Sequence, residues 1–147
     1  MDVSEFKNII WDYTRKISEN GNCIFSPVCE EYGLTMMQVR ILTELHQCGS
    51  HTIGSLANDT CMAGANISAM CKKLEKMEFL KRIRDQEDER VVKVALTDKG
   101  YEAVTEIDRT LNNKFSEQIN DMDEETLNDI IRGLKKLNIL MQKIHLR

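Results

Sequence analysis

Apolar residues near the N-terminus recur at steps of three and four, the spacing that places side chains on one face of an amphipathic helix. The members of this stripe are Phe6, Ile9, Ile10, Tyr13 and Ile17. Glycine often follows the last turn of a helix, so the pattern predicts a first helix that ends at Gly21. Residues 22–34 contain Pro27 and Gly33 and lack a clear period, which predicts a connection with a short helical turn at most.

Three helical segments are predicted to follow. Thr35 and Gln38 have the spacing of a capping box, which predicts a helix from there to Gly49. Thr52 is a candidate N-cap for a short helix over residues 53–59 (IGSLAND). A third helix is predicted to begin near Ala63, because the apolar residues that follow it share one face. These residues are Ile67, Met70, Cys71, Leu74 and Met77.

The period then changes from that of a helix to that of a strand. Residues 79–84 (FLKRIR) and 91–96 (VVKVAL) are rich in strand-forming residues, and the segment DQEDER between them is polar and charged. Two such runs joined by a polar segment predict a β-hairpin. The order helix, short helix, helix and hairpin is that of a winged helix-turn-helix, here over residues 35–97.

The remainder has helical spacing, with Thr97 or Asp98 as the cap of one helix and Asp121 or Asp123 as the cap of another. The last helix carries the stripe Leu127, Ile130, Ile131, Leu134, Leu137, Met141 and Ile144. Apolar surface in excess of what a small core covers is often buried against a second subunit. We therefore expect a mainly α protein with a small two-stranded β-wing, in which a winged helix-turn-helix is flanked by N- and C-terminal dimerisation helices, residues 1–21 and 98–147.

Composition favours one globular domain over residues 1–147. The chain has 147 residues, of which 41% are hydrophobic and 30% charged, and it contains one proline and seven glycines. No apolar run approaches a membrane span, and the N-terminus does not resemble a secretory signal, so we expect a cytoplasmic protein. The five cysteines form no C-x-x-C pair, which favours reduced thiols over a disulfide framework or a zinc ribbon.

Charge is distributed unevenly. The net charge is −4, but residues 61–84 hold six basic and two acidic side chains, which makes this window +4. The window falls on the third predicted helix and the first strand of the hairpin. Phosphate binding needs such local positive charge, so duplex DNA becomes a candidate partner.

The residue types in this window fit the two tasks of a DNA-reading helix. Small and polar residues at its start, Ala65, Asn66 and Ser68, allow close approach to base edges. Lysines one or two turns later suit phosphates; they are Lys72, Lys73 and Lys76.

The hairpin supplies further candidates for DNA contacts. Arg90 is the one cation within DQEDER and is expected to enter the minor groove, with Asp88 holding it by a charge-assisted hydrogen bond. Arg84, at the end of the first strand, is a further candidate DNA-binding residue.

Several motifs resemble one known family. The stretch from Asp88 to Gly100, DERVVKVALTDKG, contains D-x-R followed after five residues by L-T-x-x-G. Upstream stand L-T-x-x-Q from Leu34, and L-E-K and F-L-x-R from Leu74 and Phe79. This ordered set, over about residues 34–101, resembles the MarR family of bacterial and archaeal transcriptional regulators.

The resemblance implies a homodimer, formed by the first and last helices, whose two winged lobes read a pseudo-palindromic operator. It implies that Asn66, Ser68, Lys72 and Lys73 face the major groove or its phosphates and that a small-molecule effector releases the DNA of a repressor. The sequence departs from the family at four positions, where relatives often have a basic residue, a glycine, a proline and an arginine. These positions are Ala69, Glu78, Gln86 and Glu89.

Other assignments stay open at this stage. Trp11, Tyr13 and Arg15 are candidates for binding an aromatic or acidic effector, and Cys23 and Cys29 are candidates for a thiol that senses oxidants. The alternative functions are a thiol-sensing regulator of the same fold and a winged-helix interaction module that does not bind DNA.

Catalysis and metal binding have little support. His46, Cys48 and His51 lie close together in the sequence, but their spacing matches no standard metal motif, so we expect no metal. The chain has no phosphate loop or nucleophile elbow, so we expect neither an enzyme nor a cofactor.

Overall fold

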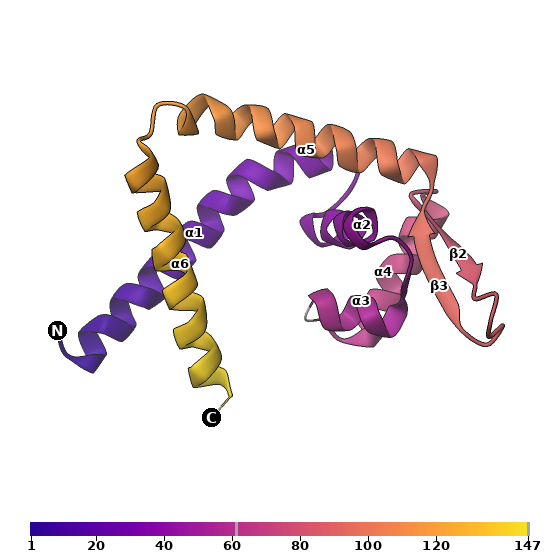
Figure 1. The fold of residues 1–147 in the computed structure, drawn as a ribbon, viewed down its shortest axis with the longest axis horizontal. Coiled ribbons are helices and arrows are strands. Elements are labelled where there is room, and N and C mark those ends of the chain that lie inside the picture. The colour runs from indigo at the N-terminus through magenta and orange to yellow at the C-terminus, as the bar shows by residue number, and fades with distance from the viewer. Residues whose placement is uncertain (61, 147) are drawn as a thin grey trace. The chain divides into compact units, whose positions relative to one another are not determined.

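A computed structural model of the protein describes residues 1–60 and 62–146. These residues form six helices and three strands (Figure 1). The elements in chain order are α1 (Val3–Glu30), α2 (Met36–Cys48), β1 (His51–Thr52), α3 (Ile53–Thr60), α4 (Gly64–Lys76), β2 (Leu80–Arg84), β3 (Val92–Leu96), α5 (Asp98–Ile119) and α6 (Glu124–His145). The predicted fold class is confirmed: the protein is mainly α, with a winged helix-turn-helix between long flanking helices.

The first helix is longer than the sequence predicts. The prediction that it ends at Gly21 is wrong, because α1 continues through Pro27 to Glu30 and buries Val28 and Cys29 in its last turn. A glycine inside a helix costs only about 1 kcal/mol relative to alanine, and burial of one aliphatic side chain contributes more than that. The chain turns instead at Gly33, which has a φ of 69°.

The second helix begins and ends where its local sequence predicts. The Thr35 amide donates to Gln38 Oε1 at 2.9 Å, and the Gln38 amide donates to Thr35 Oγ1 at 3.2 Å, which completes the capping box. Gly49 follows the last turn with a φ of 77°. The inward face of α2 buries Ile41, Leu42 and Leu45.

The two helices of the helix-turn-helix are also confirmed. Thr52 Oγ1 accepts a hydrogen bond from the Ser55 amide at 3.1 Å at the start of α3. In α4 the predicted inward stripe is buried at Ile67, Cys71 and Leu74. α3 packs against both α2 and α4, so the three helices share one core.

The wing has one more strand than expected. β2 and β3 form the predicted antiparallel hairpin, in register from Leu80 opposite Leu96 to Arg84 opposite Val92. β1 pairs with the other edge of β3, with His51 opposite Val94, so the sheet has the order β1-β3-β2. Two residues are too few to show the alternation that identifies a strand in a sequence, which is why the two-stranded prediction falls short.

The junction of α4, the wing and α5 depends on Gly100. A Cβ atom at this position would lie 2.0 Å from the Phe79 carbonyl oxygen, so only glycine allows the first turn of α5 to pack this closely. Thr97 fixes the same contact. Its amide donates to the Phe79 carbonyl at 3.2 Å, and its hydroxyl donates to the Glu78 carbonyl at 2.6 Å.

Glu78 adopts the left-handed turn that the family usually makes with glycine. Its φ is 63°, a region that costs a residue with a side chain about 1 to 2 kcal/mol. The Phe79 amide donates to the Leu74 carbonyl at 3.0 Å, which closes the end of α4 around this turn. Tertiary hydrogen bonds therefore hold a backbone conformation that the local sequence does not favour.

Contacts within the chain define two compact units, Met1–Leu111 and Asn112–Arg147. The assignment of residues 1–147 to a single domain stays a prediction. The buried core described above belongs to the first unit. In the second unit Asp123 caps α6 by accepting from the Thr126 amide at 2.8 Å, as one of the two predicted caps. None of the helices in the described residues is both long enough and apolar enough to cross a membrane.

We expect Gly100→Ala to lower the free energy of unfolding by about 3 kcal/mol, because the added methyl group forces α5 away from the Phe79 carbonyl and breaks the Thr97 contacts. Urea unfolding followed by circular dichroism measures the change. Gly54→Ala in α3 is the matched control, since a Cβ there meets nothing within 4 Å and alanine favours the helix. Equal losses in both variants would contradict the steric role of Gly100.

Candidate nucleic-acid interface

The outer face of α4 carries the residues that the sequence assigns to DNA. Ala65, Asn66, Lys72 and Lys73 are exposed, and Ser68 is half-buried. The small and polar side chains occupy the first two turns, and the lysines occupy the later turns. Within residues 1–60 and 62–146, no ion pair engages Lys72 or Lys73. α4 thus presents an uncompensated positive face to solvent.

The N-terminus of α4 is also open. Its N-cap residue, Ala63, has no side-chain oxygen to accept a hydrogen bond from the first turn. The free amides and the helix dipole make such an end favourable for an anion. This end of α4 lies beside Ala65 and Asn66, and the lysines follow in the later turns of the same helix.

The loop of the wing, residues 85–91, is held by its own acidic residues. Asp85 accepts a hydrogen bond from the Glu87 amide at 2.9 Å and pairs with Lys93 at 3.3 Å. These contacts, the Glu87 amide first, hold the pKa of the Asp85 carboxyl below its usual value. The Arg84 guanidinium donates to the Glu89 carbonyl at 2.9 Å. Arg84 therefore shapes the loop in this structure, and its predicted role in DNA binding stays a prediction.

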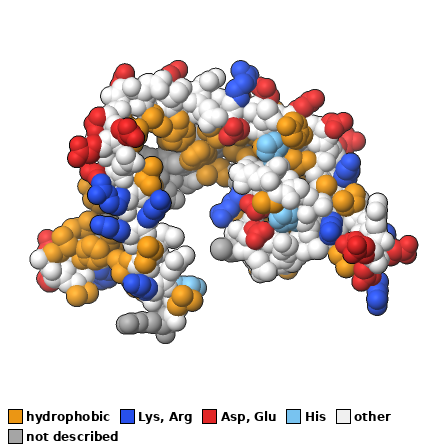
Figure 2. All heavy atoms as spheres, viewed as in Figure 1, with side chains coloured by type: hydrophobic (Ala, Val, Ile, Leu, Met, Phe, Trp, Pro, Cys, Tyr) orange, Lys and Arg blue, Asp and Glu red, His pale blue; other side chains and the backbone are white. Residues whose placement is uncertain are grey.

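Arg90 projects from this loop. Asp88 Oδ1 accepts from the Arg90 amide at 3.0 Å and from its Nε at 3.3 Å, so the expected contact between the two residues is present. The Arg90 side chain is nonetheless 93% exposed. Asp88 holds the base of the side chain, and the rest of the guanidinium faces solvent. Figure 2 shows acidic and basic side chains adjacent to each other at this end of the wing.

An ion pair links α4 to the wing. Arg82 Nε on β2 lies 3.3 Å from Glu75 Oε2 on α4. In the sequence, Arg82 stands out only as the last residue of the F-L-x-R motif, and its partner cannot be identified there. Glu75 lies in a helix and Arg82 in a strand. They become neighbours because α4 packs against β2.

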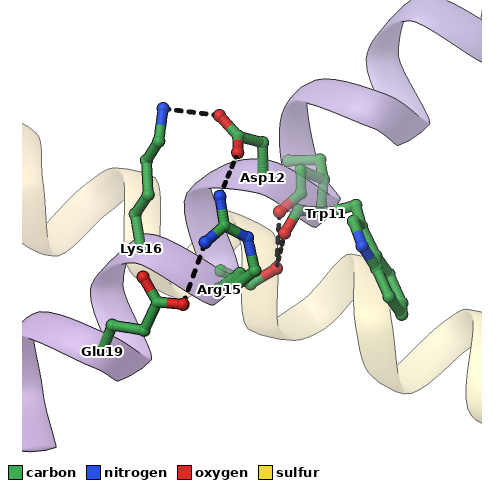
Figure 3. A network of polar contacts seen from close by, with 7 residues as sticks. Trp11, Asp12, Arg15, Lys16 and Glu19 are labelled. Atoms are coloured by element: carbon green, nitrogen blue, oxygen red, sulfur yellow. Dashed lines mark hydrogen bonds and ion pairs between the residues drawn. The ribbon is translucent and has the colours of Figure 1, made fainter.

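The candidate effector residues Trp11, Tyr13 and Arg15 are all exposed on α1. Arg15 pairs with Asp12 and Glu19, both at 2.9 Å (Figure 3). Hydrogen bonds from Lys16 and Arg15 hold the pKa of the Asp12 carboxyl below its usual value. The Trp11 indole points away from this network and is 77% exposed.

A cavity of about 510 Å³ lies between α2 and the first turns of α5. The His46 and Tyr101 rings, with centroids 4.8 Å apart, form part of its wall. Its other lining residues are Val39, Thr43, Gln47, Val104, Thr105, Ile107, Asp108 and Leu111. This cavity has no signal in the sequence, because its walls come from two helices that are distant along the chain. Thr43 on α2 and Tyr101 on α5, for example, are more than 50 residues apart.

The two thiols proposed as oxidant sensors differ in accessibility. Cys23 is exposed, whereas Cys29 is buried. Burial also raises the pKa of the Cys29 thiol, which reduces the thiolate fraction that oxidants attack. Cys71 is buried on the inward face of α4, and burial raises its pKa as well. Cys61 lies outside the described residues.

Comparison with known proteins identifies the family. The model of the family described as "Transcriptional regulator SarA/Rot" matches residues 23–107, which is more than half of the chain. The chain belongs to the SarA/Rot family of transcriptional regulators. Its similarity to "Uncharacterized HTH-type transcriptional regulator YhbI" of Bacillus subtilis is 27% identity over 95 residues, or 65% of this chain and 62% of YhbI.

Solved structures show the same fold as this SarA/Rot-family regulator. A MarR family transcription regulator, SP03579, matches with a TM-score of 0.88 and 17% identity over 98% of this chain and 95% of its own. FabT of Streptococcus pneumoniae, crystallised in complex with DNA, matches with a TM-score of 0.81 and 19% identity over 94% and 99% of the two chains. The resemblance to the MarR family is thus confirmed, and the relatives are transcriptional regulators of the winged-helix type.

Proposed function

We propose that this SarA/Rot-family regulator is a repressor that binds a pseudo-palindromic DNA operator as a homodimer and is released by a small-molecule effector. The single observation that carries the proposal is the arrangement of Arg90, which Asp88 holds at its base while its side chain stays 93% exposed. A cation held at the tip of a β-hairpin has no evident use in the core of the protein and suits the negative potential of a minor groove.

The geometry of α4 supports binding in the major groove. Its outer face has small and polar side chains first and lysines later, which matches base contacts near the helix start and phosphate contacts beyond it. The negative net charge of the chain does not oppose this, because basic side chains are concentrated in residues 61–84, which hold six basic and two acidic residues. FabT, which has this fold, was crystallised with DNA.

The homodimer is supported by apolar surface on the flanking helices. In α1, Phe6, Ile9, Tyr13 and Ile17 are exposed, and Figure 2 shows hydrophobic side chains gathered over the N-terminal half of this helix. In α6, no described residue is buried, although the helix has an apolar stripe. Its exposed members are Ile130, Ile131, Leu134, Ile139, Met141 and Ile144. A second copy of the chain would cover such faces.

Release by an effector is supported by the cavity between α2 and α5. Its volume of about 510 Å³ is within the range of small-molecule sites, and apolar residues such as Val39 and Ile107 share its walls with polar ones such as Gln47 and Asp108. α5 begins at the junction with the wing, so a ligand that separates α5 from α2 can move the wing.

The cytoplasmic location of the protein stays a prediction.

Selection from a random duplex DNA pool by the purified, reduced protein tests the proposal. We expect enrichment of a palindrome whose half-sites are about 10 base pairs, or ~34 Å, apart, since two recognition helices on one side of the duplex meet successive major grooves. Failure to enrich any sequence at low salt would favour the winged-helix interaction module. An enriched site with one half only would contradict the dimer.

We expect Arg90→Ala to weaken operator binding by roughly 1 to 3 kcal/mol without changing stability, because the side chain contacts solvent rather than the core. Fluorescence anisotropy with the selected operator measures the affinity. Arg109→Ala is the matched control, since Arg109 is an exposed arginine that pairs with Glu106 on α5 and lies outside the proposed interface.

A second variant of the wing distinguishes the positioning of Arg90 from the effect of the negative charge of Asp88. Asp88→Ala removes a negative charge near the DNA, which by itself strengthens binding, but it also frees Arg90. We expect weaker binding, because positioning of the guanidinium decides whether it enters the groove. Tighter binding by Asp88→Ala would show that Asp88 does not hold Arg90 for the DNA.

Lys73→Ala is expected to reduce the slope of log affinity against log salt by about one unit and to keep the sequence preference, because one phosphate contact is lost. The measurement is a salt titration with the operator and with one scrambled duplex. Lys114→Ala, an exposed lysine of α5, is the control. A changed preference between the two duplexes would mean that Lys73 reads bases.

A further inference from the structure

Three potential metal ligands meet at the end of α2. Glu44 and Cys48 are one helical turn apart on α2, and His51 follows in β1. One carboxylate oxygen, the Cys48 sulfur and one ring nitrogen of His51 all lie within 4.8 Å of one another. The grouping differs from the sequence trio, because His46 stacks on Tyr101 and Glu44 takes its place. Oxygen, sulfur and imidazole nitrogen together are the donor set of Zn²⁺ and similar ions.

The hydrogen bonding of His51 is unusual. Its Nε2 lies 3.2 Å from Asp59 Oδ2, while its Nδ1 is buried and has no hydrogen-bond partner among the described residues. A buried polar atom without a partner destabilises the folded state, so this nitrogen calls for an explanation. With Nε2–H donated to Asp59, Nδ1 carries a free lone pair. A histidine that donates one ring N–H to a carboxylate and offers the other nitrogen is the arrangement found at metal sites.

We propose that Glu44, Cys48 and His51 bind a divalent first-row transition-metal ion, with Zn²⁺ as the best chemical match, and that Asp59 orients His51 for this purpose. In a tetrahedral Zn²⁺ site with ligand distances of 2.0–2.3 Å, donor atoms lie roughly 3.5 Å apart. The Cys48 sulfur and Glu44 Oε1 are already 3.6 Å apart, and the His51 nitrogen lies within 4.8 Å of both. Cys48 is exposed and Glu44 is half-buried, which leaves both side chains room to rotate. Water would complete the coordination.

The chemistry of Cys48 agrees with this assignment. Its sulfur lies 3.6 Å from Glu44 Oε1, so the thiol donates to the carboxylate. Metal binding forms the sulfur–metal bond, and the thiol proton goes to solvent. The ion therefore replaces a proton between two acidic groups, and its affinity is expected to rise with pH.

The site has a defined place in the fold. His51 pairs with Val94 of β3 through β1, and Asp59 belongs to α3, the first helix of the helix-turn-helix. A bound ion would connect the end of α2 to the sheet directly and to α3 through His51. The inference does not rest on the proposed operator, because none of its residues belongs to α4 or to the loop of the wing.

Titration of the 147-residue chain with Co²⁺, in the presence of a reductant without thiols, tests the proposal. We expect one equivalent of Co²⁺ per chain, a sulfur-to-cobalt charge-transfer band in the near ultraviolet, and displacement of Co²⁺ by Zn²⁺. Cys48→Ser should abolish the band and weaken Co²⁺ binding by about tenfold or more. Asp59→Asn should keep the band and weaken binding by about tenfold, since it removes only the partner of His51.

Two variants serve as matched controls. Cys23→Ser removes another exposed thiol, and His46→Gln removes the other imidazole near the end of α2. Both should keep the band and the affinity. A band that persists in Cys48→Ser, a band lost in Cys23→Ser, or the absence of saturable Co²⁺ binding by the natural sequence would overturn the proposal. Cys48 is exposed, so the test does not depend on a variant that disturbs the core.

Discussion

The close approach of Gly100 to the Phe79 carbonyl is the constraint on which the DNA-binding lobe depends. It brings the first turn of α5 against the segment that joins α4 to the wing, at a distance that no Cβ atom permits. Thr97 adds hydrogen bonds to two consecutive carbonyls of that segment. Together they hold Glu78 in a left-handed turn and so set the direction in which β2 leaves α4. The L-T-x-x-G motif therefore acts through packing and hydrogen bonds, which fix the wing relative to α4 and α5.

The acidity of the wing has a structural explanation. Asp85 and Asp88 each accept hydrogen bonds from the backbone of the loop and each pair with a cation. The loop departs from the pattern of the MarR family at Gln86 and Glu89, where relatives often have proline and arginine. Each pair offsets one negative charge with one positive charge, so the Asp88 pair also offsets part of the charge of Arg90. The positive face of α4 comes from its own lysines, Lys72, Lys73 and Lys76, in a chain of net charge −4.

The end of α2 illustrates how an unsatisfied group marks a place of possible function. Most buried polar atoms in proteins have a partner, and His51 Nδ1 is the exception among the described residues. Asp59 Oδ2 lies 3.2 Å from the other ring nitrogen, Nε2. The same contact that leaves Nδ1 without a partner also prepares it as a ligand.

The sequence by itself determined the elements whose signals are local: the capping box at Thr35, the inward stripe of α4 and the β-hairpin all follow from residues within one or two turns or one strand. It also placed Arg90 next to Asp88, because both belong to one loop. Only the tertiary structure decided that α1 passes Gly21, that β1 adds a third strand, and that Glu44 rather than His46 joins Cys48 and His51. The reason is physical. A break in a helix, a two-residue strand and a ligand set each depend on contacts with distant segments, whose burial and hydrogen bonds outweigh local preferences of about 1 kcal/mol.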